Sequence, residues 1–373
     1  MRIDYEKRFQ EFCRILPEEA EKAGLTLKAY LLTKEEDIHY LSGFRGDSTW
    51  LLAGPDCRIL LTDSRYTEQA LQQAPGWEVL ESRLITGAAE IAAGKGPGCL
   101  GYDPLSLNVA TYRRLHEELV NAGVRPEEAM AAMASPTVRM RRIKDQAELE
   151  LIGKACSIAD QALEEVLPLL KPGITEKRLA AELEYRMALL GSEGPSFPTI
   201  VASGLRGALP HGLAGEKLLR KGDMVTIDFG AVYQGYHSDM TRTFILGKPK
   251  PLQKDRYLAV LAAQEAALAA LAPGKALREI DAVARNYLKE IGLDRYFGHG
   301  LGHSLGLEIH EEPRFSPLAP QEFLAPGMVM TVEPGIYLPE WGGLRIEDTC
   351  VITEKTCRFL TKFTKALEDI TMI

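Results

Sequence analysis

The sequence has little of what marks a nucleic-acid-binding or membrane-spanning protein. Its 373 residues include 52 acidic and 44 basic side chains, which gives a formal net charge of −8. Proteins that bind nucleic acids need an excess of Lys and Arg to neutralise phosphates. The most apolar helical stretch, residues 257–271, is interrupted by Gln264 and Glu265 and falls short of the about 20 residues that cross a bilayer. We therefore expect neither a nucleic-acid partner nor a membrane span.

Cysteine is scarce, and several familiar motifs are missing. The six cysteines are scattered without CxxC spacing, and residues 1–8 are charged and lack the apolar segment of a signal peptide. We therefore expect reduced cysteines and a cytoplasmic location. The chain also has no HExxH and no GxxxxGK[ST] string, so the sequence gives no support to a zincin or a phosphate-loop enzyme.

The chain is long enough for two domains, and its amino-terminal third differs in pattern from the rest. Residues 1–130 alternate short apolar runs with amphipathic segments, which predicts an α/β domain. A proline-punctuated linker with a basic cluster is expected at 131–144, and a second domain at 145–373. Within the first domain, strands are expected at 29–32, 49–53, 58–62 and 77–80, and helices over the first 23 residues and 107–121.

The second domain repeats itself. A helical segment ends at Gly173 and the next at Gly191; later, one ends at Gly274 and the next at Gly292. The glycines of each pair are 18 residues apart. Because glycine favours the left-handed conformation that follows a helix, each copy is predicted to be helix, break, helix and cap.

Each copy continues with acids at matched positions. Asp228 stands six residues after a glycine at the end of an apolar run, and Glu333 stands six residues after another. A further predicted strand follows in each copy and carries Asp239 in the first and Glu347 in the second. A duplication with pseudo-twofold symmetry would bring these four acids together between the halves.

Four converging carboxylates repel and raise one another's pKa unless a cation lies among them. Oxygen-rich coordination with one imidazole favours Mn²⁺ or Co²⁺ over a structural zinc, and four carboxylates suffice for two ions. The imidazole is expected from residues 299–310, which contain His299, His303 and His310 among glycines that permit tight turns.

These residues resemble a known family. Asp228, Asp239, His303, Glu333 and Glu347 are similar to the five ligands of the dinuclear site in the M24 pita-bread metallopeptidases, in particular the Xaa-Pro dipeptidase (prolidase) and aminopeptidase P subgroup. The matching strings are 61–66, 197–204, 209–211, 238–243, 298–303, 310–313 and 343–348. The resemblance spans nearly the whole chain. It implies an α+β protein with a carboxy-terminal pita-bread (creatinase/aminopeptidase) domain, duplicated internally, after a smaller creatinase-type α/β domain.

The resemblance also implies roles for these residues. Two divalent ions per subunit are expected, Mn²⁺ or Co²⁺ in preference to Zn²⁺. Asp228 would hold one, His303 and Glu333 the other, and Asp239 and Glu347 would bridge them. A hydroxide between the ions would attack the carbonyl of an Xaa-Pro bond.

The remaining site residues are also expected from the resemblance. His211 and His310 are expected to contact substrate and shuttle protons, and His299 to line the pocket. Arg345 is expected to pair with a substrate carboxylate. The resemblance also implies a homodimer in which residues 1–130 serve substrate access or dimerisation and residues 145–373 form the catalytic domain.

Two alternatives stay open at this point. One is a non-catalytic pita-bread module that binds peptides, and the other is a metal-free, creatinase-like amidinohydrolase. Both are expected to lack some metal ligands, whereas all five are present. The choice between dipeptides and longer Xaa-Pro peptides depends on loops that close the pocket beyond proline.

Overall fold

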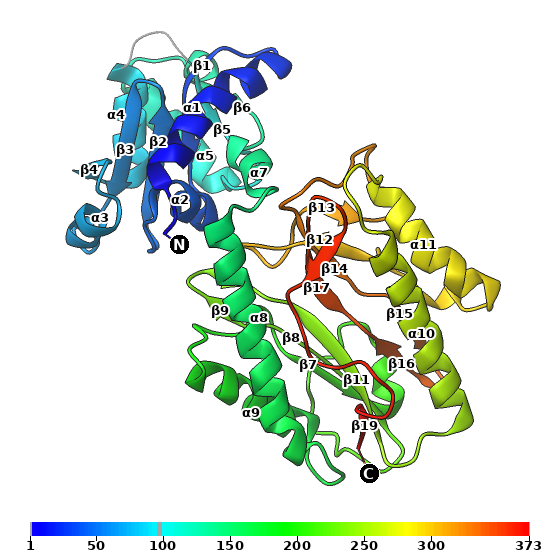
Figure 1. The fold of residues 1–373 in the computed structure, drawn as a ribbon. Coiled ribbons are helices and arrows are strands. Elements are labelled where there is room, and N and C mark those ends of the chain that lie inside the picture. The colour runs from blue at the N-terminus through cyan, green and yellow to red at the C-terminus, as the bar shows by residue number, and fades with distance from the viewer. Residues whose placement is uncertain (1, 95–98, 373) are drawn as a thin grey trace. The chain divides into compact units, whose positions relative to one another are not determined.

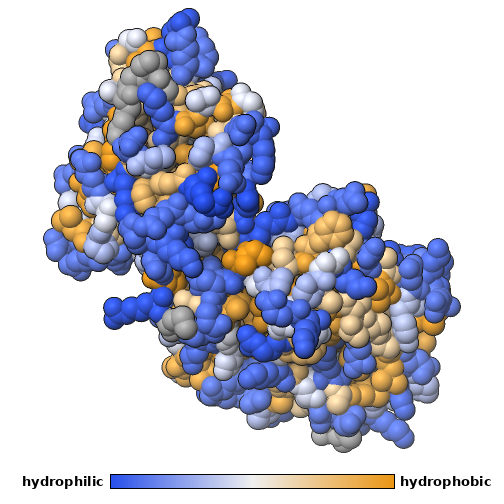
Figure 2. Space-filling model, turned by 45° about the horizontal axis from the view of Figure 1, so that its top comes forward, coloured by the Kyte–Doolittle hydropathy of each residue, from blue (hydrophilic) through white to orange (hydrophobic). Residues whose placement is uncertain are grey.

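The computed structural model describes residues 2–94 and 99–372. The chain divides into two compact units, Arg2–Arg141 and the remainder from Arg142 onward. None of the described helices combines the length and apolar character that a bilayer span requires. Polar side chains cover most of the face drawn in Figure 2, and apolar residues form scattered patches on it.

The first unit is a mixed sheet with helices (Figure 1). Its six strands run in the order β4-β3-β2-β1-β5-β6, with β1, β2 and β3 antiparallel and the outer pairs parallel. The α/β pattern expected from the sequence is present. The strands are β1 (Leu27–Leu32), β2 (Thr49–Gly54), β3 (Cys57–Thr62), β4 (Glu78–Glu81), β5 (Cys99–Tyr102) and β6 (Met130–Ala132). The helices are α1 (Tyr5–Lys22), α2 (Glu35–Ser42), α3 (Thr67–Gln73), α4 (Leu84–Gly94), α5 (Val109–Asn121), α6 (Pro126–Ala129) and α7 (Pro136–Arg141).

The second unit contains the two helix pairs that the repeat predicted. They are α8 (Gln146–Val166) with α9 (Glu176–Leu189), and α10 (Pro251–Ala270) with α11 (Leu277–Glu290). The four glycines after these helices have φ of 98° at Gly173, 100° at Gly191, 81° at Gly274 and 72° at Gly292. All four therefore adopt the left-handed conformation that glycine tolerates best. Gly191 and Gly292 directly follow the cap residues of α9 and α11, as predicted. Gly173 and Gly274 instead lie in turns beyond the ends of α8 and α10, so those two helices end earlier than the sequence predicted.

The strands between the helix pairs repeat in the same way. A four-stranded sheet runs β19-β11-β8-β7, and a five-stranded sheet runs β13-β12-β14-β17-β18. The antiparallel series β7-β8-β11 of the first half matches β12-β14-β17 of the second. Their bounds are β7 (Ile200–Ser203), β8 (Met224–Phe229), β11 (Met240–Leu246), β12 (Gly302–Ser304), β13 (Glu311–Phe315), β14 (Val329–Val332), β17 (Asp348–Ile352), β18 (Cys357–Phe359) and β19 (Thr371–Met372).

Shorter elements complete this unit. Two hairpins are formed by β9 (Val232–Tyr233) with β10 (Tyr236–His237), and by β15 (Gly335–Leu338) with β16 (Gly342–Arg345). The 3₁₀ turns are η1 (Leu167–Leu169), η2 (Gly204–Ala208) and η3 (Asp294–Tyr296). One apolar core joins both halves and includes Leu183 of α9 and Ile280 of α11. Figure 1 shows the two helix pairs on either side of the strands.

Candidate metal centre

The four repeat acids lie at equivalent strand ends. Asp228 is in β8, and Glu333 directly follows the equivalent strand β14. Asp239 directly precedes β11, and Glu347 directly precedes β17. Asp228, Asp239 and Glu347 are buried, and Glu333 is partly buried. The short apolar strands thus deliver carboxylates from both halves into one interior region.

Reciprocal hydrogen bonds connect the two halves beside these acids. Thr241, two residues after Asp239, donates its hydroxyl to Glu347 Oε2 at 2.7 Å. Thr349, two residues after Glu347, donates its hydroxyl to the backbone oxygen of Asp239 at 2.8 Å. The backbone N–H of Glu347 also donates to the Thr241 oxygen at 3.1 Å. The convergence expected from the duplication is therefore present.

His303 points its Nε2 at these carboxylates. Its Nδ1 lies 3.0 Å from the backbone oxygen of Ser304, and because a carbonyl only accepts, Nδ1 carries the proton. Nε2 lies 3.5 Å from Asp239 Oδ2 and 3.4 Å from Glu333 Oε1. Burial lowers the pKa of His303 to about 3, so the ring is neutral near pH 7. The lone pair of Nε2 thus faces the oxygens of Asp239 and Glu333.

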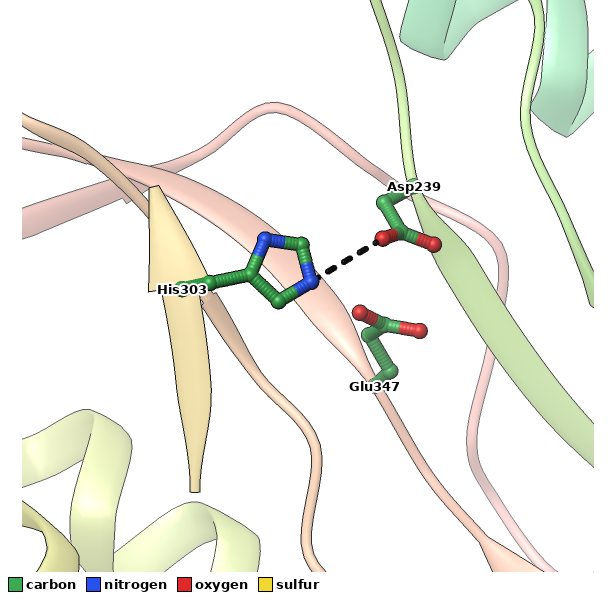
Figure 3. A group of neighbouring side chains, drawn as sticks. All are labelled: Asp239, His303 and Glu347. Atoms are coloured by element: carbon green, nitrogen blue, oxygen red, sulfur yellow. Dashed lines mark ion pairs between the residues drawn. The ribbon is translucent and has the colours of Figure 1, made fainter. Parts of the chain in front are cut away.

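Three of these side chains could hold one metal ion. One ligand atom each from Asp239, His303 and Glu347 lies within 4.8 Å of the others, and Figure 3 shows the three side chains pointing toward a common space. Among the residues that the structure describes, two buried oxygens of the site, Asp228 Oδ1 and Glu347 Oε1, have no hydrogen-bond partner. Such orphaned oxygens are costly in a folded protein. A divalent cation would supply the missing partner, so the residues fit a metal.

The carboxyl pKa values reflect the same arrangement. Burial first, and neighbouring carboxylates second, raise the pKa of Asp239 and Glu347 well above their usual range. Burial raises the pKa of Glu333 to about 7, and Arg345 opposes that rise. The sequence led us to expect mutual repulsion as the cause, but removal from water has the larger effect.

Arg345 lies among the acids. Its buried guanidinium pairs with Asp228 through Nη2, and its Nε donates to Thr241 Oγ1 at 3.1 Å. Its Nη1 donates to Tyr337 Oη at 2.6 Å and to the backbone oxygen of Pro210 at 3.3 Å. Arg345 thus supplies a positive charge to the carboxylates that the sequence alone did not place there. One guanidinium can balance the charge of only one carboxylate. Other cations are needed to balance the remaining three.

The three other histidines of the expected site differ in setting. The ring of His310 packs edge-on against His303 with centroids 4.4 Å apart, and burial followed by Arg314 lowers the pKa of His310. His299 donates from Nδ1 to the Gly300 oxygen at 2.7 Å. His211 is exposed and directly follows Pro210, whose oxygen Arg345 binds.

Tyr337 is a member of the site that the sequence did not reveal. Its hydroxyl accepts from Arg345 and lies 3.1 Å from His299 Nε2. Because Nδ1 of His299 carries the proton, Nε2 accepts from the tyrosine. Burial lowers the pKa of His299 to about 4, which keeps this acceptor neutral. Tyr337 lies four residues beyond Glu333 in β15, but no motif marks it.

Comparison with known proteins finds two family matches. Residues 150–354 match Metallopeptidase family M24, and residues 16–143 match the Creatinase/Prolidase N-terminal domain. The M24 match covers more than half of the chain and contains all five expected ligands.

Similar proteins cover nearly the whole chain. The chain is 41% identical over 345 residues to the uncharacterized peptidase YqhT of Bacillus subtilis (strain 168), covering 92% of this chain and 96% of the relative. A solved Xaa-Pro dipeptidase from Bacillus anthracis superposes with a TM-score of 0.91 at 37% identity, covering 98% of this chain and 100% of that one. An X-Pro aminopeptidase from Thermotoga maritima MSB8 gives 0.86 at 35% identity, covering 98% and 99%.

Proposed function

This chain belongs to metallopeptidase family M24, and on that basis we propose that it hydrolyses the peptide bond between an amino-terminal residue and a following proline. The names of the similar solved proteins, an Xaa-Pro dipeptidase and an X-Pro aminopeptidase, support this substrate class. The five ligand positions argue against a non-catalytic peptide-binding module and against a metal-free amidinohydrolase.

The observation that carries the proposal is the convergence of Asp239, His303 and Glu347 on one space. We assign them, with Asp228 and Glu333, as ligands of two divalent ions, Mn²⁺ or Co²⁺ in preference to Zn²⁺. Carboxylate-rich coordination with one imidazole supports this choice of metals. When bound, such ions polarise a substrate carbonyl and lower the pKa of water.

The protein's own groups hold the ligands in place. The hydrogen bond from Nδ1 of His303 to the Ser304 oxygen fixes the tautomer and leaves Nε2 as the ligand atom. The Thr241 hydroxyl orients one oxygen of Glu347, and Arg345 orients Asp228. These contacts keep the donor atoms in place before the substrate arrives.

The histidines around the centre suit proton transfer and substrate binding. We assign to His310, beside His303, the transfer of a proton between water and the leaving proline nitrogen, because its lowered pKa keeps it neutral and able to accept. We assign His211 to substrate contact and to the same proton transfer. His299 and Arg345, joined through Tyr337, are assigned to substrate binding.

Dipeptides are the substrates we propose first. The similarity to the Bacillus anthracis dipeptidase over 98% of this chain supports them. Cleavage of longer peptides with proline at position 2 is the second candidate, supported by the Thermotoga maritima aminopeptidase. We also propose a homodimer, which light scattering of the purified protein tests.

Product analysis tests the reaction. Ala-Pro, Ala-Pro-Gly and a longer Xaa-Pro peptide are incubated with protein loaded with Mn²⁺, Co²⁺ or Zn²⁺, and creatine serves as the substrate of the amidinohydrolase alternative. Release of free alanine from Ala-Pro alone indicates a strict dipeptidase, and release from all three indicates aminopeptidase activity. Turnover of creatine without metal, with no peptide cleavage, would contradict the proposal.

A further inference from the structure

Lys144 is a buried lysine that the proposed reaction does not use. Its side chain is 1% exposed. Its ammonium donates to Ser304 Oγ at 2.8 Å and to Glu311 Oε2 at 3.1 Å. Burial of an ammonium is costly, and an ion pair of this kind adds little net stability. Net stability therefore does not explain Lys144, whereas the residues beside its two partners do.

The two partners face each other across an irregular point of the sheet. In the pairing of β12 with β13, His303 lies opposite Arg314, whereas the next residue, Ser304, lies opposite Glu311. The register thus shifts directly after His303, and at this point β13 contains two more residues than β12. The ammonium of Lys144 bridges the first cross-strand pair beyond the shift.

Both partners adjoin functional histidines. Ser304 follows His303 and supplies the backbone oxygen that accepts from its Nδ1. Glu311 follows His310, whose ring packs against His303. A displacement of either partner would therefore change the direction of an imidazole in the centre.

The backbone of Lys144 is anchored independently of these partners. Its N–H donates to the Gly327 oxygen at 2.9 Å. Gly327, with φ of 87°, lies in the turn that begins β14, the strand before Glu333. Lys144 thus connects the turn before β14 to the strand pair that contains His303.

We propose that Lys144 is a positioning residue for the metal centre. By holding Ser304 and Glu311 together, it directs Nε2 of His303 toward the metal and keeps His310 beside it. It acts through these neighbours and touches neither metal nor substrate. The inference rests on the proposed function, because it takes His303 to be a ligand.

Metal binding by the metal-free protein tests this role without any peptide. The affinity for Mn²⁺ is measured by the electron paramagnetic resonance signal of the free ion. Lys144→Met is expected to weaken it about 10–100-fold, the usual effect of removing an outer partner of a ligand. The visible absorption of the Co²⁺-loaded variant should also change, because it reports ligand geometry. With Ala-Pro, kcat should fall more than KM rises.

Lys217→Met is the matched control. The ammonium of Lys217 also binds a serine hydroxyl and a carboxylate, Ser203 Oγ at 2.6 Å and Asp223 Oδ2 at 2.7 Å. These partners lie at the end of β7 and just before β8. The control should keep the Mn²⁺ affinity and the Co²⁺ spectrum of the wild type. A loss of affinity equal to that of Lys144→Met would contradict a specific role for Lys144.

Two further variants separate positioning from stability. Lys144→Met/Glu311→Leu removes both charges, so it should regain thermal stability while its Mn²⁺ affinity stays weak. Ser304→Ala keeps the ion pair and should weaken affinity with little change in melting temperature. If Lys144→Met does not fold, the Mn²⁺ affinities of these two variants show whether Lys144 positions the centre. Wild-type affinity in both would overturn the inference.

The outcomes also distinguish this inference from the proposed function. A wild-type protein that fails to bind Mn²⁺ or Co²⁺ would contradict the metallopeptidase assignment. A wild-type protein that binds metal, with unchanged affinity in all the Lys144 and Ser304 variants, would contradict only the positioning role.

Discussion

At His303, the proton on one ring nitrogen decides what the other nitrogen can bind. Nδ1 donates to a backbone oxygen, so Nε2 faces Asp239 and Glu333 as a lone pair. His299 follows the same rule, since its Nδ1 donates to Gly300 and its Nε2 accepts from Tyr337. In both residues a backbone carbonyl selects the tautomer, and a neutral ring is favoured by burial.

Removal of the Tyr337 hydroxyl should impair catalysis more than folding. Tyr337→Phe breaks the link between Arg345 and His299, at a cost in stability of about 1 kcal/mol for a hydrogen bond. If the link orients the transition state, kcat for Ala-Pro should fall at least about tenfold, which corresponds to ~1.4 kcal/mol.

A second tyrosine provides the comparison. Tyr257 is fully buried in α10, and its hydroxyl donates to the Lys365 oxygen at 2.9 Å. Tyr257→Phe should lower the melting temperature by a similar amount and leave kcat unchanged. Equal kcat in both variants would show that Tyr337 is only structural.

At the scale of the elements, small residues allow β12 to lie close to β14. A Cβ on Gly302, the residue before His303, would lie 2.1 Å from the Thr331 oxygen. The backbone N–H of His303 also donates to Thr331 Oγ1 at 3.0 Å. The close approach of the two strands thus fixes the position of the histidine.

Two glycine substitutions should therefore have opposite effects. Gly302→Ala must push β12 away from β14. We therefore expect the free energy of unfolding to fall by about 1–3 kcal/mol and metal binding to weaken. Gly153 lies inside α8, where an added Cβ meets nothing within 4 Å. Gly153→Ala should stabilise the protein by about 0.5–1 kcal/mol with normal metal binding. Chemical denaturation measures the stability of each variant, and Mn²⁺ titration measures its metal affinity. Destabilisation by both glycine substitutions would contradict the packing argument.

The sequence predicted the elements better than the direction of individual side chains. Gly173 and Gly191, with their counterparts in the second half, revealed the repeat because all four have the positive φ that favours glycine, although only Gly191 and Gly292 directly follow a helix cap. The matched spacing of the four repeat acids then predicted that they lie close together between the two halves. By contrast, the approach of Arg345 to Asp228 and the position of Tyr337 depend on which face of the β15–β16 hairpin packs on the site. Strand alternation gives two faces but does not say what lies against each.

At the scale of the whole molecule, the metal-free protein contains carboxyl groups that folding has moved out of water. Burial raises the pKa of Glu333 from 4.5 to about 7, and that of Asp239 and Glu347 also rises. A raised pKa favours the protonated form in the folded state. Glu333 therefore contributes stability below about pH 4.5 that is lost as the pH rises through about 7. The raised pKa values of Asp239 and Glu347 act in the same direction.

Metal should reverse that dependence. Because bound cations favour ionised carboxylates, the difference in melting temperature between Mn²⁺-loaded and chelated protein should grow from pH 5 to pH 8. At a free metal concentration of about 100 Kd, the stabilisation is about 2.7 kcal/mol. Differential scanning fluorimetry across this pH range measures it. A difference that stays constant or shrinks with pH would argue against carboxylate ligands at the centre.

The release of alanine from Ala-Pro tests the central assignment most directly. The account predicts release by Mn²⁺- or Co²⁺-loaded protein, loss of release after thorough chelation, recovery when metal is restored, and none in Asp239→Ala or Glu347→Ala. Release that survives chelation, or that persists in both variants, would contradict the assignment of this site as a metallopeptidase centre.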